Sequence, residues 1–167
     1  MVLSDYHVLV VEDDLDAIRS LKTACPKEGV TFSVVDPAHS LDPSYVQQKV
    51  HEGVGRRVIG FVDLNYKLRK DQGESLDLDG GDVVKKWASW RADGTLPEGL
   101  EAVCVRTSHS NLIDPRNPYM KLRRANPVLK VFGLEKKGVY GDQGMDWLLL
   151  YDAGDVRDQL NVVRNPV

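Results

Sequence analysis

Residues 8–14 read VLVVEDD, and residues 58–63 read VIGFVD. Each stretch is a short apolar run that ends in acid, which indicates a buried strand with carboxylates at its carboxyl end. Neighbouring parallel strands would bring these carboxylates together at the edge where open α/β sheets bind ligands. Because clustered carboxylates repel one another, we expect a cation among them, and Mg²⁺ is a hard ion that prefers oxygen ligands.

The composition is that of an ordinary globular domain. The 167 residues are 42% hydrophobic and carry a net charge of −3, with no internal repeat, so we expect a single domain over 1–167. This charge gives no argument for a nucleic-acid or membrane partner, and no apolar run is long enough to span a bilayer. Cys25 and Cys104 lack metal-ligand spacing, and we expect core thiols in a reducing cytoplasm.

Strand and helix patterns alternate along the chain, which predicts an α/β fold with a mostly parallel sheet. The expected strands cover residues 6–11, 30–35, 58–62, 102–105 and 128–134. The expected helices begin at Leu15, Pro43 and Gly80, with a short one near Pro118 and a C-terminal one from Trp147. The first should present Leu15, Ile18, Leu21 and Cys25 on one face and stop at Pro26. The polar stretch 65–79 reads as an extended surface loop.

Further polar residues follow the fourth and fifth expected strands. Thr107 and Ser108 come after one, and Lys136 and Lys137 come after the other. Carboxylates, a hydroxyl and an ammonium at one edge are the groups that handle a phosphoryl group, since a bound metal and a lysine neutralise its oxygens. An aspartate can itself act as the nucleophile and form an acyl phosphate.

In this order, the strand-end groups resemble those of response-regulator receiver domains from two-component signalling systems. Residues 8–14 are similar to that family's first strand, residues 62–64 to its phosphoacceptor strand, and residues 79–84 to the start of its third helix. The resemblance covers nearly the whole chain and includes no output domain. It implies a flavodoxin-like, doubly wound, five-stranded parallel sheet in the order 2-1-3-4-5, with helices on both faces.

The resemblance also implies a metal site. Asp13 and Asp63 would bind Mg²⁺ through their carboxylates, and Glu12 would do so directly or through water. The backbone carbonyl of Asn65 would complete the protein ligands. All four positions follow the first and third expected strands.

Asp63 would be the phosphoacceptor in this comparison. Thr107 would hydrogen-bond the phosphoryl group, and the small Ser108 would leave room for it. Lys136 would pair with the phosphoryl oxygens, although Lys137 is an alternative because the register of the lysine is ambiguous.

These roles imply a signalling phosphoacceptor, not an enzyme, beyond self-phosphorylation and autodephosphorylation. A histidine kinase or histidine phosphotransfer protein would supply the phosphoryl group, and the domain would signal by binding an unidentified downstream protein. The sequence leaves open whether the domain forms a homodimer.

Two other functions remain open at this stage. The family usually has a proline after its lysine and an aromatic residue three positions before it, whereas here Lys137 or Gly138 follows and Gly133 or Leu134 precedes. These differences favour a pseudo-receiver, a binding module that is not phosphorylated. A phosphohydrolase of the haloacid-dehalogenase type needs a second aspartate two positions after the nucleophile, and Asn65 at that position argues against it.

Overall fold

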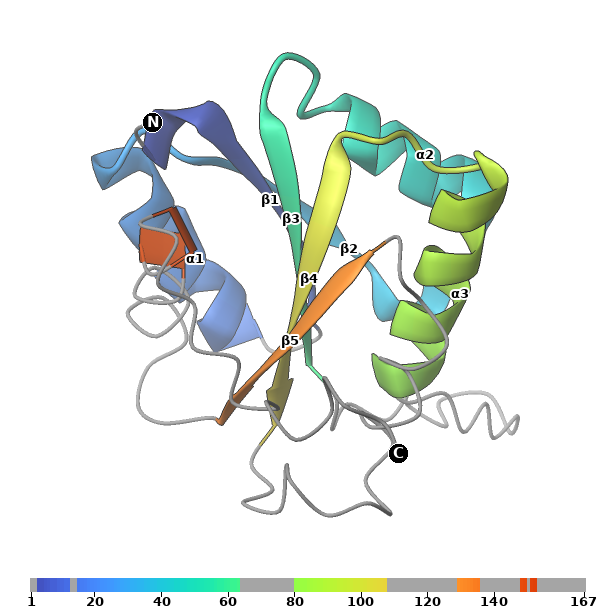
Figure 1. Cartoon of the computed structure of the whole chain (residues 1–167). Coiled ribbons are helices and arrows are strands. Elements are labelled where there is room, and N and C mark those ends of the chain that lie inside the picture. Colours follow the sequence, from blue (N-terminus) through green and yellow to red (C-terminus); the bar gives the residue numbers. More distant parts are fainter. Residues whose placement is uncertain are drawn as a thin grey trace, which may run out of the picture.

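A parallel sheet forms the centre of the computed structural model, which describes residues 3–12, 15–63, 80–107, 129–135, 148–149 and 151–152. Its strands follow the spatial order β2-β1-β3-β4-β5 (Figure 1). Their bounds are β1 (Tyr6–Val11), β2 (Thr31–Val35), β3 (Arg57–Asp63), β4 (Leu100–Thr107) and β5 (Lys130–Glu135). The helices are α1 (Leu15–Lys27), α2 (Pro43–His51) and α3 (Gly80–Asp93), with short 3-10 turns at Leu3–Asp5 and Pro37–His39.

The helices cover both faces of the sheet. Helix α1 lies on one face, and α2 and α3 lie on the other (Figure 1). Strand β1 is buried along its whole length and serves both layers, because alternate side chains of a strand point to opposite faces. Leu9 and Val11 pack with Trp87 of α3 on one side, whereas Val8 and Val10 pack with Leu21 of α1 on the other.

The helix boundaries follow local chemistry. Helix α2 begins where the Asp42 carboxylate accepts hydrogen bonds from the backbone N–H groups of Ser44 and Tyr45, with Pro43 in the first turn. Helix α1 continues to Lys27, one residue past the expected stop at Pro26. Its expected apolar face is buried at Leu21 and Cys25 but not at Leu15, whose exposed fraction is 72%.

These features confirm the predicted parallel α/β class. Cys25 and Cys104 are buried thiols without a disulfide, as expected. Within the described segments, no helix is both long and apolar enough to cross a membrane. The expected 65–79 loop and the short helix near Pro118 lie outside the described residues.

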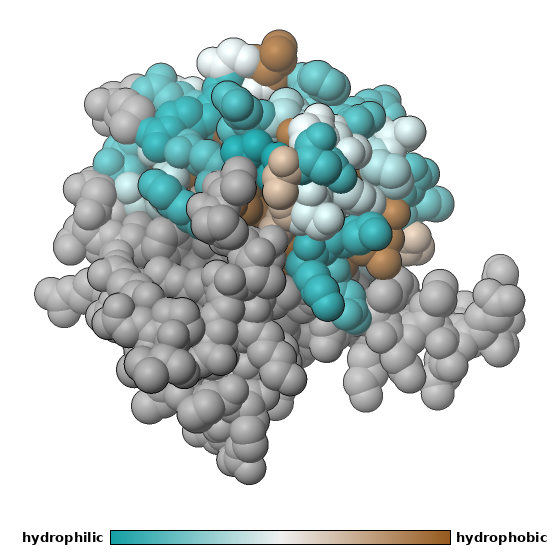
Figure 2. Space-filling model, turned by 45° about the vertical axis from the view of Figure 1, so that its right-hand side comes forward, coloured by the Kyte–Doolittle hydropathy of each residue, from teal (hydrophilic) through white to brown (hydrophobic). Residues whose placement is uncertain are grey.

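The surface over α2 and α3 is largely polar. Figure 2 shows hydrophilic residues over most of the described part of this face, with apolar residues scattered between them. Scattered apolar side chains are normal for a soluble surface and do not mark a binding site.

Candidate functional site

The sheet register aligns the candidate residues at the carboxyl ends of the strands. Val11 pairs with Val62, so the next residue, Glu12, is level with Asp63. Asp63 pairs in turn with Arg106 of β4, and Thr107 pairs with Glu135 of β5. Adjacent strands are about 4.8 Å apart, so the sheet brings these positions to one edge.

The backbone register also aligns four positions across the strands at this edge. Val10, Phe61 and Cys104 form the row one step earlier, and all three are buried on the α1 side. Because side chains alternate with a period of two, residues two positions further along share that face. By backbone register, the aligned positions at the edge are Glu12, Asp63, Arg106 and Leu134.

Glu12 is the member of the expected metal site whose side chain the structure describes. It is only 4% exposed, and burying a carboxylate is costly without compensating partners. A buried carboxylate level with a second acidic residue is a donor set that fits Mg²⁺, which takes oxygen ligands. For Asp63 and Thr107 the structure describes the backbone, at the ends of β3 and β4.

The other expected site residues lie outside the described residues; they are Asp13, Asn65, Ser108, Lys136 and Lys137. Among the side chains that are described, no three His, Cys, Asp or Glu groups converge as a metal site. The metal and phosphoryl roles thus remain predictions, supported at Glu12, Asp63 and Thr107 by the placement of the backbone.

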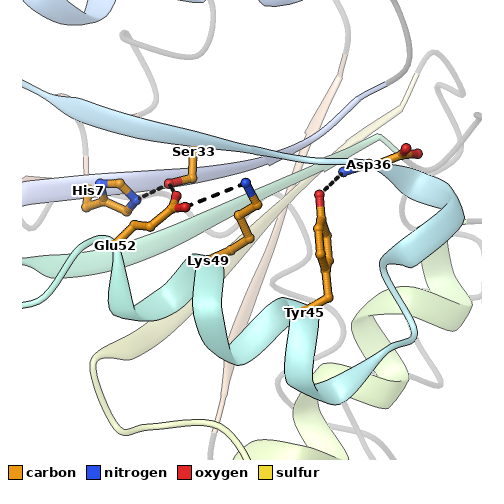
Figure 3. A network of polar contacts seen from close by, with 6 residues as sticks. All are labelled: His7, Ser33, Asp36, Tyr45, Lys49 and Glu52. Atoms are coloured by element: carbon orange, nitrogen blue, oxygen red, sulfur yellow. Dashed lines mark hydrogen bonds and ion pairs between the residues drawn. The ribbon is translucent and has the colours of Figure 1, made fainter.

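A buried polar network lies at the other end of β1 (Figure 3). The His7 ring is 2% exposed, with Nδ1 2.7 Å from the Thr31 hydroxyl and Nε2 2.9 Å from the Ser33 hydroxyl. Ser33 donates its proton to the Glu52 carboxylate, which also lies 3.6 Å from Lys49. Since Ser33 donates to Glu52, it accepts from His7, and the Nε2–H tautomer satisfies the chain of bonds.

Burial sets the charge of this histidine. Burial lowers the pKa of His7, the Glu52 carboxylate acts in the opposite direction, and Arg56 lowers it further. The net pKa lies below its ordinary value, so the imidazole is neutral near pH 7. The network joins β1, β2 and the end of α2, and we assign it a role in stability because it lies away from the carboxyl edge.

A second polar cluster lies at the amino ends of the strands, on the side of the sheet that α1 covers. The Arg57 guanidinium donates to both Glu101 oxygens, at 2.5 Å from Nε and 2.8 Å from Nη2. The Tyr151 hydroxyl donates to Glu101 at 2.9 Å, and the Arg57 guanidinium lies 4.9 Å from the centre of the Tyr6 ring. This cluster attaches Tyr151 to strands β3 and β4.

Sequence reasoning missed both amino-end clusters and gave no role to Arg106. A signal for the first was present, because His7 interrupts an apolar strand while Thr31 and Ser33 alternate in the next one. A signal for Arg106 was its charge at the end of the apolar run 102–105. Neither signal names a partner, since the pairing depends on the register of separate strands.

Comparisons with known proteins support the fold. No family model and no curated protein sequence matches the chain. A solved response regulator receiver domain from Rhodospirillum rubrum is similar with a TM-score of 0.54 and 17% identity, covering 92% of this chain and 99% of that one. A CheY-like receiver domain protein from Methanospirillum hungatei JF-1 gives a TM-score of 0.51 and 16% identity, covering 97% and 99%. The chain therefore has a receiver-like fold.

Proposed function

We propose that this domain accepts a phosphoryl group on Asp63 in a two-component signalling system. The observation that carries the proposal is the register that aligns the buried Glu12 with Asp63 at the carboxyl edge and places Thr107 at the end of the next strand. Asp13 and the backbone carbonyl of Asn65 would complete a Mg²⁺ site with these two acids. A histidine kinase or a histidine phosphotransfer protein would be the donor.

The chemistry requires an aspartate that can act as a nucleophile. A carboxylate oxygen of Asp63 would attack the phosphorus of a phosphohistidine, forming an acyl phosphate. The phosphorus–nitrogen bond would break, and its electron pair would return to the donor imidazole. The Thr107 hydroxyl would donate to a phosphoryl oxygen, and Lys136 or Lys137 would add positive charge.

The acidic row itself explains the need for a cation. Two carboxylates on neighbouring strands repel each other and resist desolvation. Bound Mg²⁺ would offset this repulsion and neutralise phosphoryl oxygens. Glu12 would hold that cation from a buried position.

The test is modification by small phosphoryl donors and their analogues. Wild-type protein with Mg²⁺ should gain one phosphoryl group from acetyl phosphate by intact mass spectrometry, and should bind beryllofluoride by ¹⁹F NMR. Asp63→Asn should do neither. Asp5→Asn is the matched control, because Asp5 is exposed and precedes β1 at the opposite end of the sheet. Absence of both signals in the wild type, or their persistence in Asp63→Asn, contradicts the proposal.

A binding module without phosphorylation is the second candidate. Gly133 and Leu134 lie in β5, where receiver domains usually have an aromatic residue that responds to phosphorylation. Without that aromatic residue, the domain could still bind a partner through its surface. A wild type that folds but shows neither phosphorylation nor beryllofluoride binding would favour this function.

A further inference from the structure

The buried ring of His7 belongs to the residue type that takes up a proton closest to neutral pH. Its two hydrogen-bonding partners, Thr31 and Ser33, are uncharged hydroxyl groups on β2. His39 and His51, in contrast, are exposed to solvent. The contacts of His7 therefore suit a neutral imidazole, and a second proton would place a charge on a side chain that is only 2% exposed.

The turn at residues 52–55, which follows α2, packs directly on this ring. A Cβ at Gly53 would lie 2.6 Å from two atoms of the imidazole, so the backbone of the turn touches it. The backbone hydrogen bonds of the turn are local, from Gly53 N–H to the Val50 carbonyl and from Arg56 N–H to the Gly53 carbonyl. The turn ends at Gly55, whose φ of +84° only glycine adopts readily. Residues 52–55 can therefore move without breaking the ladder of the sheet.

This turn lies between two anchored residues. Before it, Val50 is buried in the core between α2 and the sheet. After it, the Arg56 guanidinium donates to two backbone carbonyls of neighbouring segments, at 2.7 Å and 2.9 Å. Between these anchors, the turn is held to the sheet by its packing on His7 and by the hydrogen bond from Ser33 to Glu52. A change in His7 thus acts first on this turn.

The charges around the ring determine how it responds to a proton. Among the described residues, the Glu52 carboxylate favours protonation of His7, whereas burial and the Arg56 guanidinium oppose it. Glu52 stabilises the proton weakly, because its side chain is 42% exposed and lies 3.6 Å from the Lys49 ammonium. The strands beside the ring contribute uncharged groups, the hydroxyls of Thr31 and Ser33 on β2 and the apolar Val58 on β3. Burial dominates, and the pKa of His7 lies below its ordinary value of 6.5.

We propose that His7 is a proton-sensitive latch for the turn at residues 52–55. The neutral ring holds this turn against β1 and β2. When the ring takes up a proton, the turn moves away and admits water, while the sheet stays folded. Acid drives the opening because the exposed ring binds the proton more readily than the buried ring. The latch goes beyond the phosphoryl function proposed above and does not depend on it, since it lies at the opposite end of β1.

The test is amide hydrogen exchange, measured by NMR at each residue and corrected for the intrinsic effect of pH on exchange. Between about pH 7 and pH 5, opening at the Gly53, Val54 and Arg56 amides should increase roughly ten- to thirtyfold, the factor expected when a histidine of ordinary pKa is freed. Amides within α1 should change much less. His7→Gln has no titrating ring and should lose the increase. His51→Gln removes an exposed histidine at the end of α2 and should keep it.

Four outcomes overturn the latch. They are no increase in wild type, an equal increase throughout α1 and α3, an increase that persists in His7→Gln, and an increase that is lost in His51→Gln. Should His7→Gln fail to fold, the wild-type ring decides, because the NMR shift of its Cε1–H group reports protonation. A ring that titrates while exchange at residues 52–55 stays constant shows that the proton is accommodated in place, which also overturns the inference.

Discussion

Replacing Gly53 with alanine should break the packing between the end of α2 and the start of β1. Gly53 lies in the turn after α2, and a Cβ there would be 2.6 Å from the Cγ and Cδ2 atoms of the His7 ring. Ordinary contact begins at 3.4 Å, so the ring or the turn must move by about 0.8 Å, the difference between these two distances. Both ring nitrogens already have partners, at 2.7 Å and 2.9 Å, so the ring cannot move without stretching those bonds.

The expected cost follows from these contacts. Overpacking a core costs about 1–3 kcal/mol. Weakening the two hydrogen bonds of the ring adds roughly 1 kcal/mol for each bond. We expect Gly53→Ala to lower the free energy of unfolding by about 3–5 kcal/mol, which is a large part of the stability of a typical domain. For a chain of this size the melting temperature should fall by roughly 6–20 °C.

Urea unfolding, followed by tryptophan fluorescence, measures this change because Trp87 is fully buried. Gly99→Ala is the matched control, since a Cβ at Gly99 meets nothing within 4 Å and its backbone φ is not in the left-handed region. The control should stay within about 0.5 kcal/mol of wild type or become slightly more stable. Equal stability of the two variants would refute the reasoning that the His7 network fastens α2 to the sheet.

Three further outcomes are expected. Burial holds the pKa of His7 below its ordinary 6.5, so the unfolded state binds the proton more readily than the folded state. The contribution of His7 to the free energy of unfolding is therefore complete above pH 6.5 and decreases as the pH drops below that value. Urea titrations at several pH values should show a smaller decrease in His7→Gln than in wild type. Tyr151→Phe removes the hydroxyl bonded to Glu101 and should cost about 1–2 kcal/mol in urea unfolding, whereas Leu149→Ala, at an exposed position, should change little. Glu12→Gln removes a buried carboxylate. Without Mg²⁺, the melting temperature of this variant should match or exceed that of wild type. Added Mg²⁺ should raise the melting temperature of the variant less than that of wild type.

Much of the fold could be predicted because its signals are local. The apolar runs at 8–11 and 58–62 are strands in the structure, and the Asp42-Pro43 pair begins α2. Strand ends were less predictable: β4 begins at Leu100, two residues before the expected start, because Leu100 pairs with Val58 and is buried there. That burial comes from a distant strand, which no local pattern reports.

The polar clusters show a larger gap between sequence and structure. His7 meets Ser33 from 26 residues away, and Arg57 meets Glu101 from 44 residues away. Each residue type was visible in the sequence, but its partner was not. A buried polar group needs a partner, and the sheet determines which distant residue provides it.

The sequence by itself determined the chemistry available at the strand ends: acids after the first and third strands, a hydroxyl after the fourth and lysines after the fifth. Only the tertiary structure decided which of these groups are neighbours. It placed Glu12 level with Asp63, and it paired the backbone of Asp63 with that of Arg106. The physical reason is register, because a shift of one residue between parallel strands moves every side chain to the opposite face of the sheet.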